Sequence, residues 1–176
     1  MINSNELRAL LTYDKDTGVF RRNTSSGGQE IGSIAGTISK YGYIRIRIKN
    51  KAYFAHRLAW LYEYGVWPEN EIDHINGEKS DNRLINLREA SRSGNNHNKK
   101  HQKNSASGVK GVSWSKKDKR WHARCRANKQ TVYFGSFMDL EEAMLAVIKA
   151  REKYHGNFAN NEIVNINTLQ EKSCQK

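Results

Sequence analysis

Four polar side chains between positions 73 and 95 restrict how this chain can fold. Asp73 and His74 are adjacent, and Asn86 and Asn95 follow at intervals that suit a strand, a loop, a second strand and a short helix. A segment of this kind can fold back on itself and bring the four side chains together. The spacing therefore predicts a compact polar site built by about residues 70–98.

The residue types at these positions can support phosphodiester hydrolysis. Asp73 offers oxygens of the kind that Mg²⁺ prefers, and Asn95 can add a carbonyl oxygen. His74 can be neutral near pH 7 and take a proton from water. Asn86 could hold the other ring nitrogen of His74, or it could fix the loop. The alternative is an ordinary turn, because pairs such as Asn76-Gly77 are common in turns.

The segment from Tyr43 to about Asn98 resembles the HNH endonuclease family, in the form found in phage genomes and in free-standing homing endonucleases. The matching residues are Ala55–Trp60, Asp73–Gly77, Asp81–Arg83, Asn86–Arg88 and Asn95. The resemblance implies a ββα-metal fold in which Asp73 and His74 lie on the first strand and Asn95 on the helix. It implies that His74 is the base, that Asn86 positions the site, and that Asp73 and Asn95 bind a divalent ion, expected to be Mg²⁺. His97 is the alternative to Asn95.

A second module is predicted between residues 108 and 159. Residues 110–115, 121–127 and 131–137 read as three short strands, with turns at Asp118-Lys119 and Asn128-Lys129. Asp139 is expected to cap a helix that runs to about Tyr154 and ends at Gly156. One sheet face would pack on that helix, which leaves the other face free to bind a partner.

This module resembles the APETALA-type, or ethylene-response-factor type, DNA-binding domain. The likeness lies in residues 107–112, 121–124, 133–137 and 141–143. It implies a DNA-facing set made of Lys110, Ser113, Arg124, Arg126, Thr131 and Tyr133. Lys110 and Ser113 replace arginines of the plant members, so the base preference of those members does not carry over. Arginines on such a sheet can bind guanine in the major groove.

Charge identifies a nucleic acid as the expected partner. The 176 residues carry a net charge of +12 with a sequence pI of about 9.8. Between residues 43 and 49 isoleucines alternate with basic residues, so Arg45 and Arg47 should share one strand face. That face is a candidate phosphate-binding surface, and a merely solvated face is the alternative. The expected partner is double-stranded DNA, and no protein partner is evident.

The remaining features concern location and redox state. No apolar run reaches the length of a transmembrane helix, and the first residues lack a signal-peptide pattern. Cys125 and Cys174 are far apart, so a disulfide is not expected. We expect a cytoplasmic, nucleoid-associated protein of a bacterial host.

The sequence thus predicts an α+β chain with three parts. Residues 1–103 would form the HNH nuclease domain with additional N-terminal strands, residues 104–160 the APETALA-type domain, and residues 161–176 a polar tail. The expected function is metal-dependent, homing-endonuclease-like cleavage of double-stranded DNA. A non-catalytic DNA-binding transcriptional regulator is the first alternative, and an RNA-binding or RNA-cleaving protein is the second.

Overall fold

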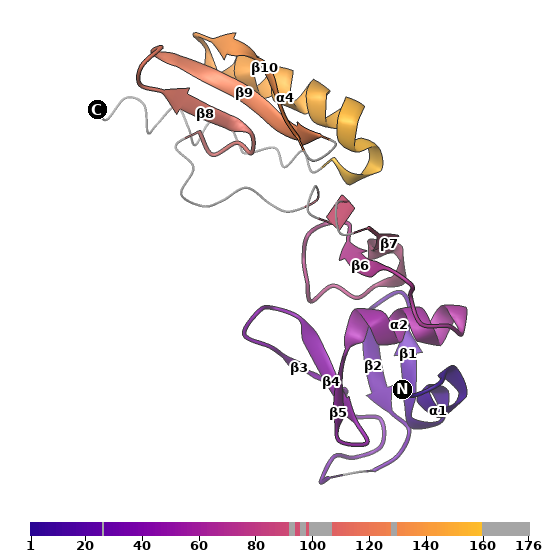
Figure 1. Cartoon of the computed structure of the whole chain (residues 1–176). Helices are drawn as coiled ribbons and strands as arrows, with labels where there is room; N and C mark the ends of the chain where they lie inside the picture. Colours follow the sequence, from indigo (N-terminus) through magenta and orange to yellow (C-terminus); the bar gives the residue numbers. More distant parts are fainter. Residues whose placement is uncertain (26, 92–93, 96–97, 99–106, 128–129, 160–176) are drawn as a thin grey trace. The chain divides into compact units, whose positions relative to one another are not determined.

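The described part of the chain consists of small antiparallel sheets and helices (Figure 1). The computed structural model describes residues 1–25, 27–91, 94–95, 98, 107–127 and 130–159. It divides into two units, Met1–Asn95 and Asn96–Lys176. The domain boundary expected near Asn104 lies outside the described residues. The mixed α+β class expected from the sequence is confirmed.

The first unit contains, in its described part, three small sheets, the helices α1 and α2, and the helical residues 94–95. Its elements are α1 (Ser4–Leu10), β1 (Leu11–Asp14), β2 (Val19–Arg22), β3 (Thr37–Ile38), β4 (Ile44–Ile48), β5 (Lys51–Phe54), α2 (Ala55–Tyr64), β6 (Glu71–His74), the 3₁₀ turn η1 (Leu84–Asn86) and β7 (Leu87–Ala90). The sheets are β1–β2, β3–β4–β5 and β6–β7, all antiparallel. One apolar core, centred on Leu58 and Leu61 of α2 and on Phe20 of β2, joins these layers.

The alternation predicted between residues 43 and 49 is confirmed. On β4, Ile46 and Ile48 are buried while Arg45 and Arg47 are exposed, because alternate residues of a strand point to opposite faces. Helix α2 ends at Gly65, which adopts a left-handed conformation with φ +76°. Glycine reaches that conformation without the steric cost that a β-carbon would add.

The prediction for residues 5–20 omitted one strand. The sequence suggested a helix up to Leu11, but α1 ends at Leu10 and Leu11 begins β1. Leu11 and Tyr13 are buried against the core while Thr12 and Asp14 are exposed. This two-residue alternation, together with pairing to β2, outweighs continuation of the helix.

The strand expected over residues 34–39 is also shorter than predicted. Only Thr37 and Ile38 form β3, and Ile34 makes an isolated bridge to Arg21. Gly36 separates the two with φ +114°, and a β-carbon there would lie 2.8 Å from Cγ2 of Ile44. The left-handed turn of the backbone at Gly36 interrupts the ladder.

The second unit is a three-stranded sheet covered on one face by a helix. Its elements are β8 (Val112–Ser115), β9 (Arg120–Ala127), β10 (Gln130–Phe137), α4 (Leu140–His155) and the 3₁₀ turn η2 (Gly156–Phe158). The strand order is β10–β9–β8, and Ala123 of β9 packs with Val147 of α4 in the core. Oδ1 of Asp139 accepts hydrogen bonds from the first-turn N–H groups of Glu141 and Glu142.

The predicted sheet and capped helix of this unit are therefore confirmed. The expected turn at Asn128-Lys129 and the tail at 161–176 lie outside the described residues. In the described part of the chain, no helix is both long and apolar enough to cross a membrane. Cys125 is a free, buried thiol in the sheet.

Candidate active site and nucleic-acid interface

The β6–β7 hairpin carries the centre of the candidate active site. Its register places Asp73 opposite Arg88 and His74 opposite Leu87. The side chains of Asp73 and His74 are both buried, at 4% and 5% exposure. Polar groups at such exposure require partners, because an unpartnered buried polar group costs free energy.

The ring of His74 is held by an amide and enclosed by aromatic rings. Its Nε2 lies 3.3 Å from Oδ1 of Asn82. The His56 ring is 5.0 Å away in an edge-on arrangement, and the Tyr43 ring is 6.0 Å away. Burial lowers the pKa of His74, and the contact with Asn82 partly opposes that effect. A neutral imidazole, which can accept a proton, is therefore favoured.

Asn82 is itself fixed from both ends. Its side-chain amide donates to the carbonyl of Ser80, and its backbone carbonyl accepts a 2.7 Å hydrogen bond from the hydroxyl of Tyr13. The residue is 1% exposed. The sequence contained Asn82 within the quoted motif but indicated no role for it. Its separation from His74 by a loop hid the contact, and only its presence in the motif could have suggested it.

Asn86 holds the loop between β6 and η1. Its Oδ1 accepts a 3.0 Å hydrogen bond from the backbone N–H of Asn76, and its Nδ2 donates a 2.8 Å hydrogen bond to the backbone carbonyl of Asp81. These two bonds tie the loop at both ends. Of the two roles expected for Asn86, the geometry corresponds to fixing the loop, while the amide beside the His74 ring belongs to Asn82.

Asp73 is paired with an arginine that the sequence did not single out for a role. Nε and Nη2 of Arg88 lie 3.0 and 2.8 Å from Oδ2 of Asp73. The β6–β7 register brings the two together, because directly opposed residues point to the same face. Arg88 thus supplies a positive charge to the carboxylate that was expected to bind a cation.

Asn95 lies close to a second carboxylate. Its Nδ2 donates to Oε2 of Glu71 at 2.7 Å. The N–H of Gly94 bonds to Oγ of Ser91 and the N–H of Asn95 to the carbonyl of Ser91, as expected of a helix N-cap. His97, the alternative ligand, lies outside the described residues.

The available donors suit a hard cation. Glu71 and Asp73 are alternate residues of β6, so they point to the same side of the strand. With Asn95 they provide carboxylate and amide oxygens, which Mg²⁺ and Ca²⁺ prefer over nitrogen or sulfur. Among the described residues, no group of three His, Cys, Asp or Glu side chains is arranged to hold a metal. The amide oxygen of Asn95 is a further oxygen donor near these carboxylates.

His56 is a second buried histidine beside His74. Its ring stacks on Phe54 at 5.4 Å, and burial lowers its pKa to about 3. The positive charges of a protonated His74 and of Arg57 also lower the pKa of His56. Its Nδ1 is a buried atom with no hydrogen-bond partner. His56 thus packs between the rings of Phe54 and His74.

Of the six residues expected to face DNA in the second unit, five lie on β8, β9 and β10, and Lys110 lies just before β8. Arg124 lies opposite Tyr133, and Arg126 lies opposite Thr131. Ser113 lies opposite His122, whose ring is 5.5 Å from that of Tyr133. These residues therefore share the sheet face opposite α4. Lys110 precedes β8, and its carbonyl accepts a hydrogen bond from the buried Arg151.

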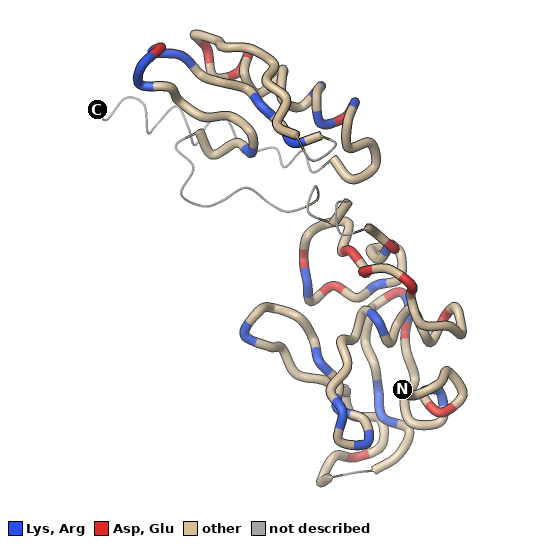
Figure 2. The backbone as a smooth tube through the Cα atoms, viewed as in Figure 1, with Lys and Arg blue, Asp and Glu red and all other residues tan. Residues whose placement is uncertain are grey.

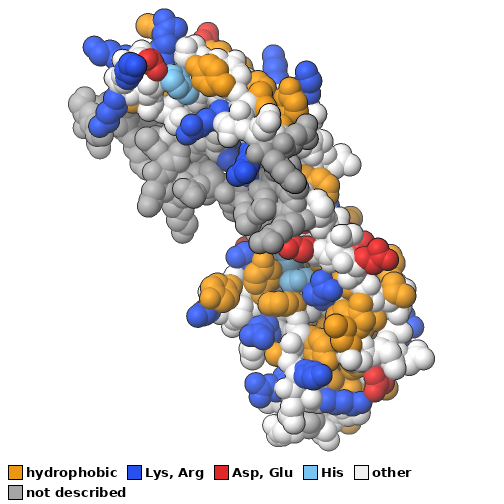
Figure 3. All heavy atoms as spheres, viewed as in Figure 1, with side chains coloured by type: hydrophobic (Ala, Val, Ile, Leu, Met, Phe, Trp, Pro, Cys, Tyr) orange, Lys and Arg blue, Asp and Glu red, His pale blue; other side chains and the backbone are white. Residues whose placement is uncertain are grey.

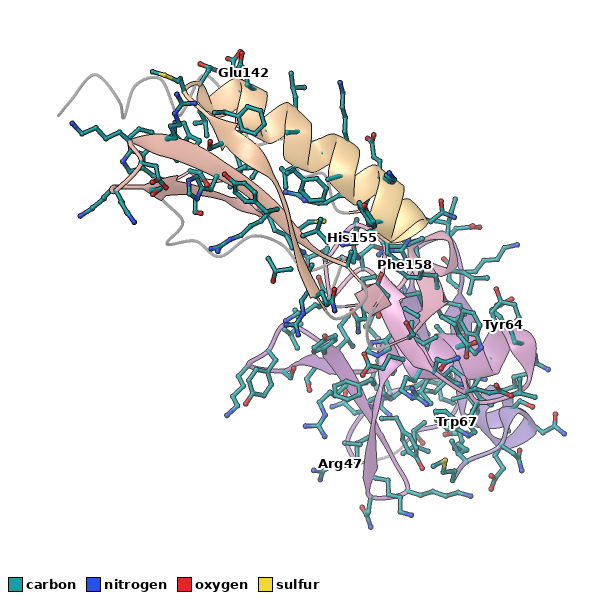
Figure 4. All side chains as sticks on the ribbon, turned by 45° about the horizontal axis from the view of Figure 1, so that its top comes forward. Arg47, Tyr64, Trp67, Glu142, His155 and Phe158 are labelled. Atoms are coloured by element: carbon teal, nitrogen blue, oxygen red, sulfur yellow. The ribbon has the colours of Figure 1, made fainter. Side chains whose placement is uncertain are left out.

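The two arginines expected on the first unit lie together on the outer face of β4. Arg45 pairs with Phe54 of β5, and Arg47 pairs with Ala52. Figure 2 shows the Lys and Arg positions along these strands, while Asp and Glu gather around β6 and β7. Arg47 is labelled in Figure 4, where its side chain projects outward from β4.

Comparisons with known proteins identify the domain that carries this candidate site. The family described as HNH endonuclease matches residues 53–97, which include β6, β7, His56, His74 and Asn82. Protein 3.8 of Escherichia phage T7 is 36% identical over 110 residues, which cover 62% of this chain and 90% of that protein. No solved structure matches the chain significantly. The chain therefore belongs to the same family as protein 3.8 of phage T7, and its residues 53–97 form an HNH endonuclease domain, which is the domain of a phosphodiester hydrolase.

Proposed function

We propose that this protein is a metal-dependent endonuclease that cuts double-stranded DNA, in the manner of the homing endonucleases it resembles. The observation that carries the proposal is the buried His74 ring, held by Asn82 and adjacent in the chain to a buried carboxylate. Two more features support it: the net charge of +12 and the membership of the HNH endonuclease family.

His74 is the general base of the proposed reaction. Its neutral ring takes a proton from a water molecule as the water oxygen forms a bond to phosphorus. As this bond forms, the bond from phosphorus to the 3′ oxygen breaks and the leaving oxygen takes a proton from solvent water, which leaves 5′ phosphate and 3′ hydroxyl ends, as the family resemblance implies. Asn82 keeps the ring in one orientation, and the loop tied by Asn86 keeps Asn82 in place.

HNH nucleases generally use a divalent metal ion, and this site would hold one through Asp73 and Asn95. A bound Mg²⁺ supplies charge stabilisation to the phosphate oxygens and to the leaving oxygen. Glu71 lies close enough to Asn95 to orient its amide. Arg88, held on Asp73, brings a positive charge to the same place and is positioned to contact a phosphate.

The second unit is proposed to recognise duplex DNA as an APETALA-type domain. Its outer face presents Arg124, Arg126 and Tyr133, with Thr131 and Ser113 beside them. A three-stranded sheet with this face can enter the major groove. We place the HNH nuclease domain in residues 1–103, the recognition domain in residues 104–160 and a tail in residues 161–176. Tethering raises the local concentration of the nuclease at its DNA site.

Plasmid cleavage tests the proposal. Purified protein is incubated with supercoiled plasmid in Mg²⁺ or EDTA, beside His74→Ala, and DNA affinity is measured in parallel. We expect nicking or linearisation in Mg²⁺ alone, with cleavage lost and affinity kept in His74→Ala. Binding without cutting under several metals would favour the regulator, and a His74→Ala protein that cuts at the wild-type rate would refute the assigned base. Competition between duplex DNA and single-stranded RNA tests the RNA alternative.

A further inference from the structure

The outer face of the β3–β4–β5 sheet combines positive charge with exposed aromatic surface. Residues 37–54 contain five Lys or Arg and no Asp or Glu. The face itself is formed by Tyr43, Arg45, Arg47 and Phe54, and we call these four residues the β4–β5 outer face. The side chains of Arg45 and Arg47 are exposed, and Phe54 is 39% exposed. Such a surface suits a ligand with both negative charge and flat apolar groups.

A continuous series of contacts leads from this face to the proposed catalytic histidine. The guanidinium carbon of Arg45 lies 5.6 Å from the centre of the Phe54 ring. The Phe54 ring lies 5.3 Å from the Tyr43 ring, which in turn lies 6.0 Å from the His74 ring. These contacts all fall within the first unit. Arg45 on the exposed face is therefore connected to the buried His74 ring through Phe54 and Tyr43.

A lysine from the active-site loop adds a positive charge next to Tyr43. Nζ of Lys79 lies 4.9 Å from the centre of the Tyr43 ring and 3.1 Å from the carbonyl of Tyr41, to which it donates. The lysine thus links the loop after His74 to the β3–β4 turn. Figure 3 shows hydrophobic side chains gathered beside Lys and Arg side chains on one face of the first unit.

We infer that the β4–β5 outer face binds the backbone of the cleaved DNA strand on one side of the scissile phosphate. Arg45 and Arg47 contact phosphates, and Phe54 and Tyr43 contact the sugars or bases between those phosphates and His74. Arginine, aromatic and histidine groups in this order match a strand whose phosphates alternate with apolar groups. The inference rests on the proposed nuclease function and adds a substrate-binding surface to it.

The test compares two double variants of the full-length protein. Arg45→Gln with Arg47→Gln removes two charges from the face. Lys15→Gln with Lys51→Gln removes two charges elsewhere in the same unit, since Lys15 lies in the β1–β2 turn and Lys51 pairs with the inward-facing Ile48. Cleavage of plasmid in Mg²⁺ gives kcat and KM, and circular dichroism checks folding.

We expect the arginine double variant to raise KM roughly tenfold with little change in kcat. Its slope of log affinity against log salt should be smaller by about 2, because each lost phosphate contact removes about 0.9 from the slope. The lysine double variant should resemble the wild type. Equal effects of the two double variants would overturn the inference, because general charge would then explain them.

A positional test uses duplexes that carry a neutral methylphosphonate at single phosphates beside the mapped cut. A methylphosphonate on one side of the cut should slow cleavage by the wild-type protein. The same methylphosphonate should not slow cleavage by the arginine double variant any further. Identical responses of the two proteins would overturn the inference while leaving the nuclease function intact. A wild-type protein that cuts no duplex would instead refute the proposed function, and the inference with it.

Discussion

The hydroxyl of Tyr13 donates a 2.7 Å hydrogen bond to the backbone carbonyl of Asn82, whose side chain contacts the His74 ring. A strand near the N-terminus is therefore connected to the active-site loop. The neighbouring β1–β2 turn adds a second connection, since the carbonyl of Lys15 accepts a 2.9 Å hydrogen bond from the N–H of Leu84. The N-terminal hairpin thus supports the HNH loop.

Substitution of Gly18 should disrupt that support. A β-carbon at Gly18 would lie 2.5 Å from the backbone nitrogen of Arg83 and 2.5 Å from the carbonyl carbon of Asn82, and its φ is +74°. Gly32 is a matched control, because its φ is +81° and nothing lies within 4 Å of its β-carbon position. We expect Gly32→Ala to cost about 1–2 kcal/mol in backbone strain.

Gly18→Ala should lower the free energy of unfolding by more than Gly32→Ala, and it should also reduce the cleavage rate of the folded protein. Urea unfolding of the two variants provides the comparison. Equal losses of stability would show that the β1–β2 turn can move away from the loop without penalty.

Asn82 should be required for cleavage rate and not for DNA affinity. Asn82→Ala removes the contact to Nε2 of His74, and loss of a group that orients an active-site residue typically costs 10–100-fold. Asn70→Ala, a change on the exposed segment before β6, is the control. Cleavage is measured at a temperature where circular dichroism shows both variants folded. An Asn82→Ala protein as active as Asn70→Ala would remove Asn82 from the site.

Asn86 should act through the loop. Asn86→Ala removes the acceptor of the Asn76 N–H and the donor to the Asp81 carbonyl. We expect a loss of about 1–3 kcal/mol in stability for groups left unpaired, faster hydrogen exchange of the Asn76 amide, and reduced cleavage. Cleavage lost with the Asn76 exchange rate unchanged would instead indicate direct participation in chemistry.

The stability of the first unit should fall as pH drops below about 6.5. Burial lowers the pKa of folded His56 to about 3, whereas an unfolded histidine titrates near 6.5. Between these values the unfolded chain binds a proton that the folded chain does not, so stability decreases by about 1.4 kcal/mol per pH unit for such a group. The lowered pKa of His74 acts in the same direction.

Urea unfolding at several pH values between 7 and 5 measures this slope, and it should be shallower in His56→Leu. The titration of Asp81 lies outside this pH range, because the pKa of Asp81 is lowered to about 2, mainly by its hydrogen bond with Arg83. The same slope in wild type and His56→Leu would mean that His56 is protonated in the folded protein.

The salt dependence of DNA affinity should show which face of the second unit, the outer sheet face or α4, binds DNA. Arg124→Ala with Arg126→Ala removes two charges from the proposed DNA face, whereas Lys149→Ala with Lys153→Ala removes two from α4. The arginine variant should bind specific DNA more weakly and with a smaller salt slope. If the lysine variant lost as much affinity, the helix would be part of the binding surface.

The parts of the fold that follow local rules were predictable from the sequence. The alternation on β4 and β9 and the caps at Asp139 and Gly65 each depend on a few neighbouring residues. Strand β1 was missed because four residues with two inward side chains become a strand only through pairing with β2.

The candidate site likewise has a part that the sequence predicts and a part that depends on tertiary contacts. The chain order of Asp73, His74, Asn86 and Asn95 predicts a candidate site, and Asp73 and His74 do lie together on strand β6. The partners of those residues depend on tertiary contacts: Arg88 reaches Asp73 through the strand register, and Asn82 reaches His74 through a loop held by Tyr13. Sequence spacing alone does not encode such contacts.

Because Asn86 ties its loop through the backbones of Asn76 and Asp81, the residue serves folding even where no bond is cut. A descendant that kept this hairpin only to bind DNA would still need Asn86 to hold the loop. In homologous chains, a retained Asn86 would therefore mark an intact hairpin, whether or not the chain cleaves DNA.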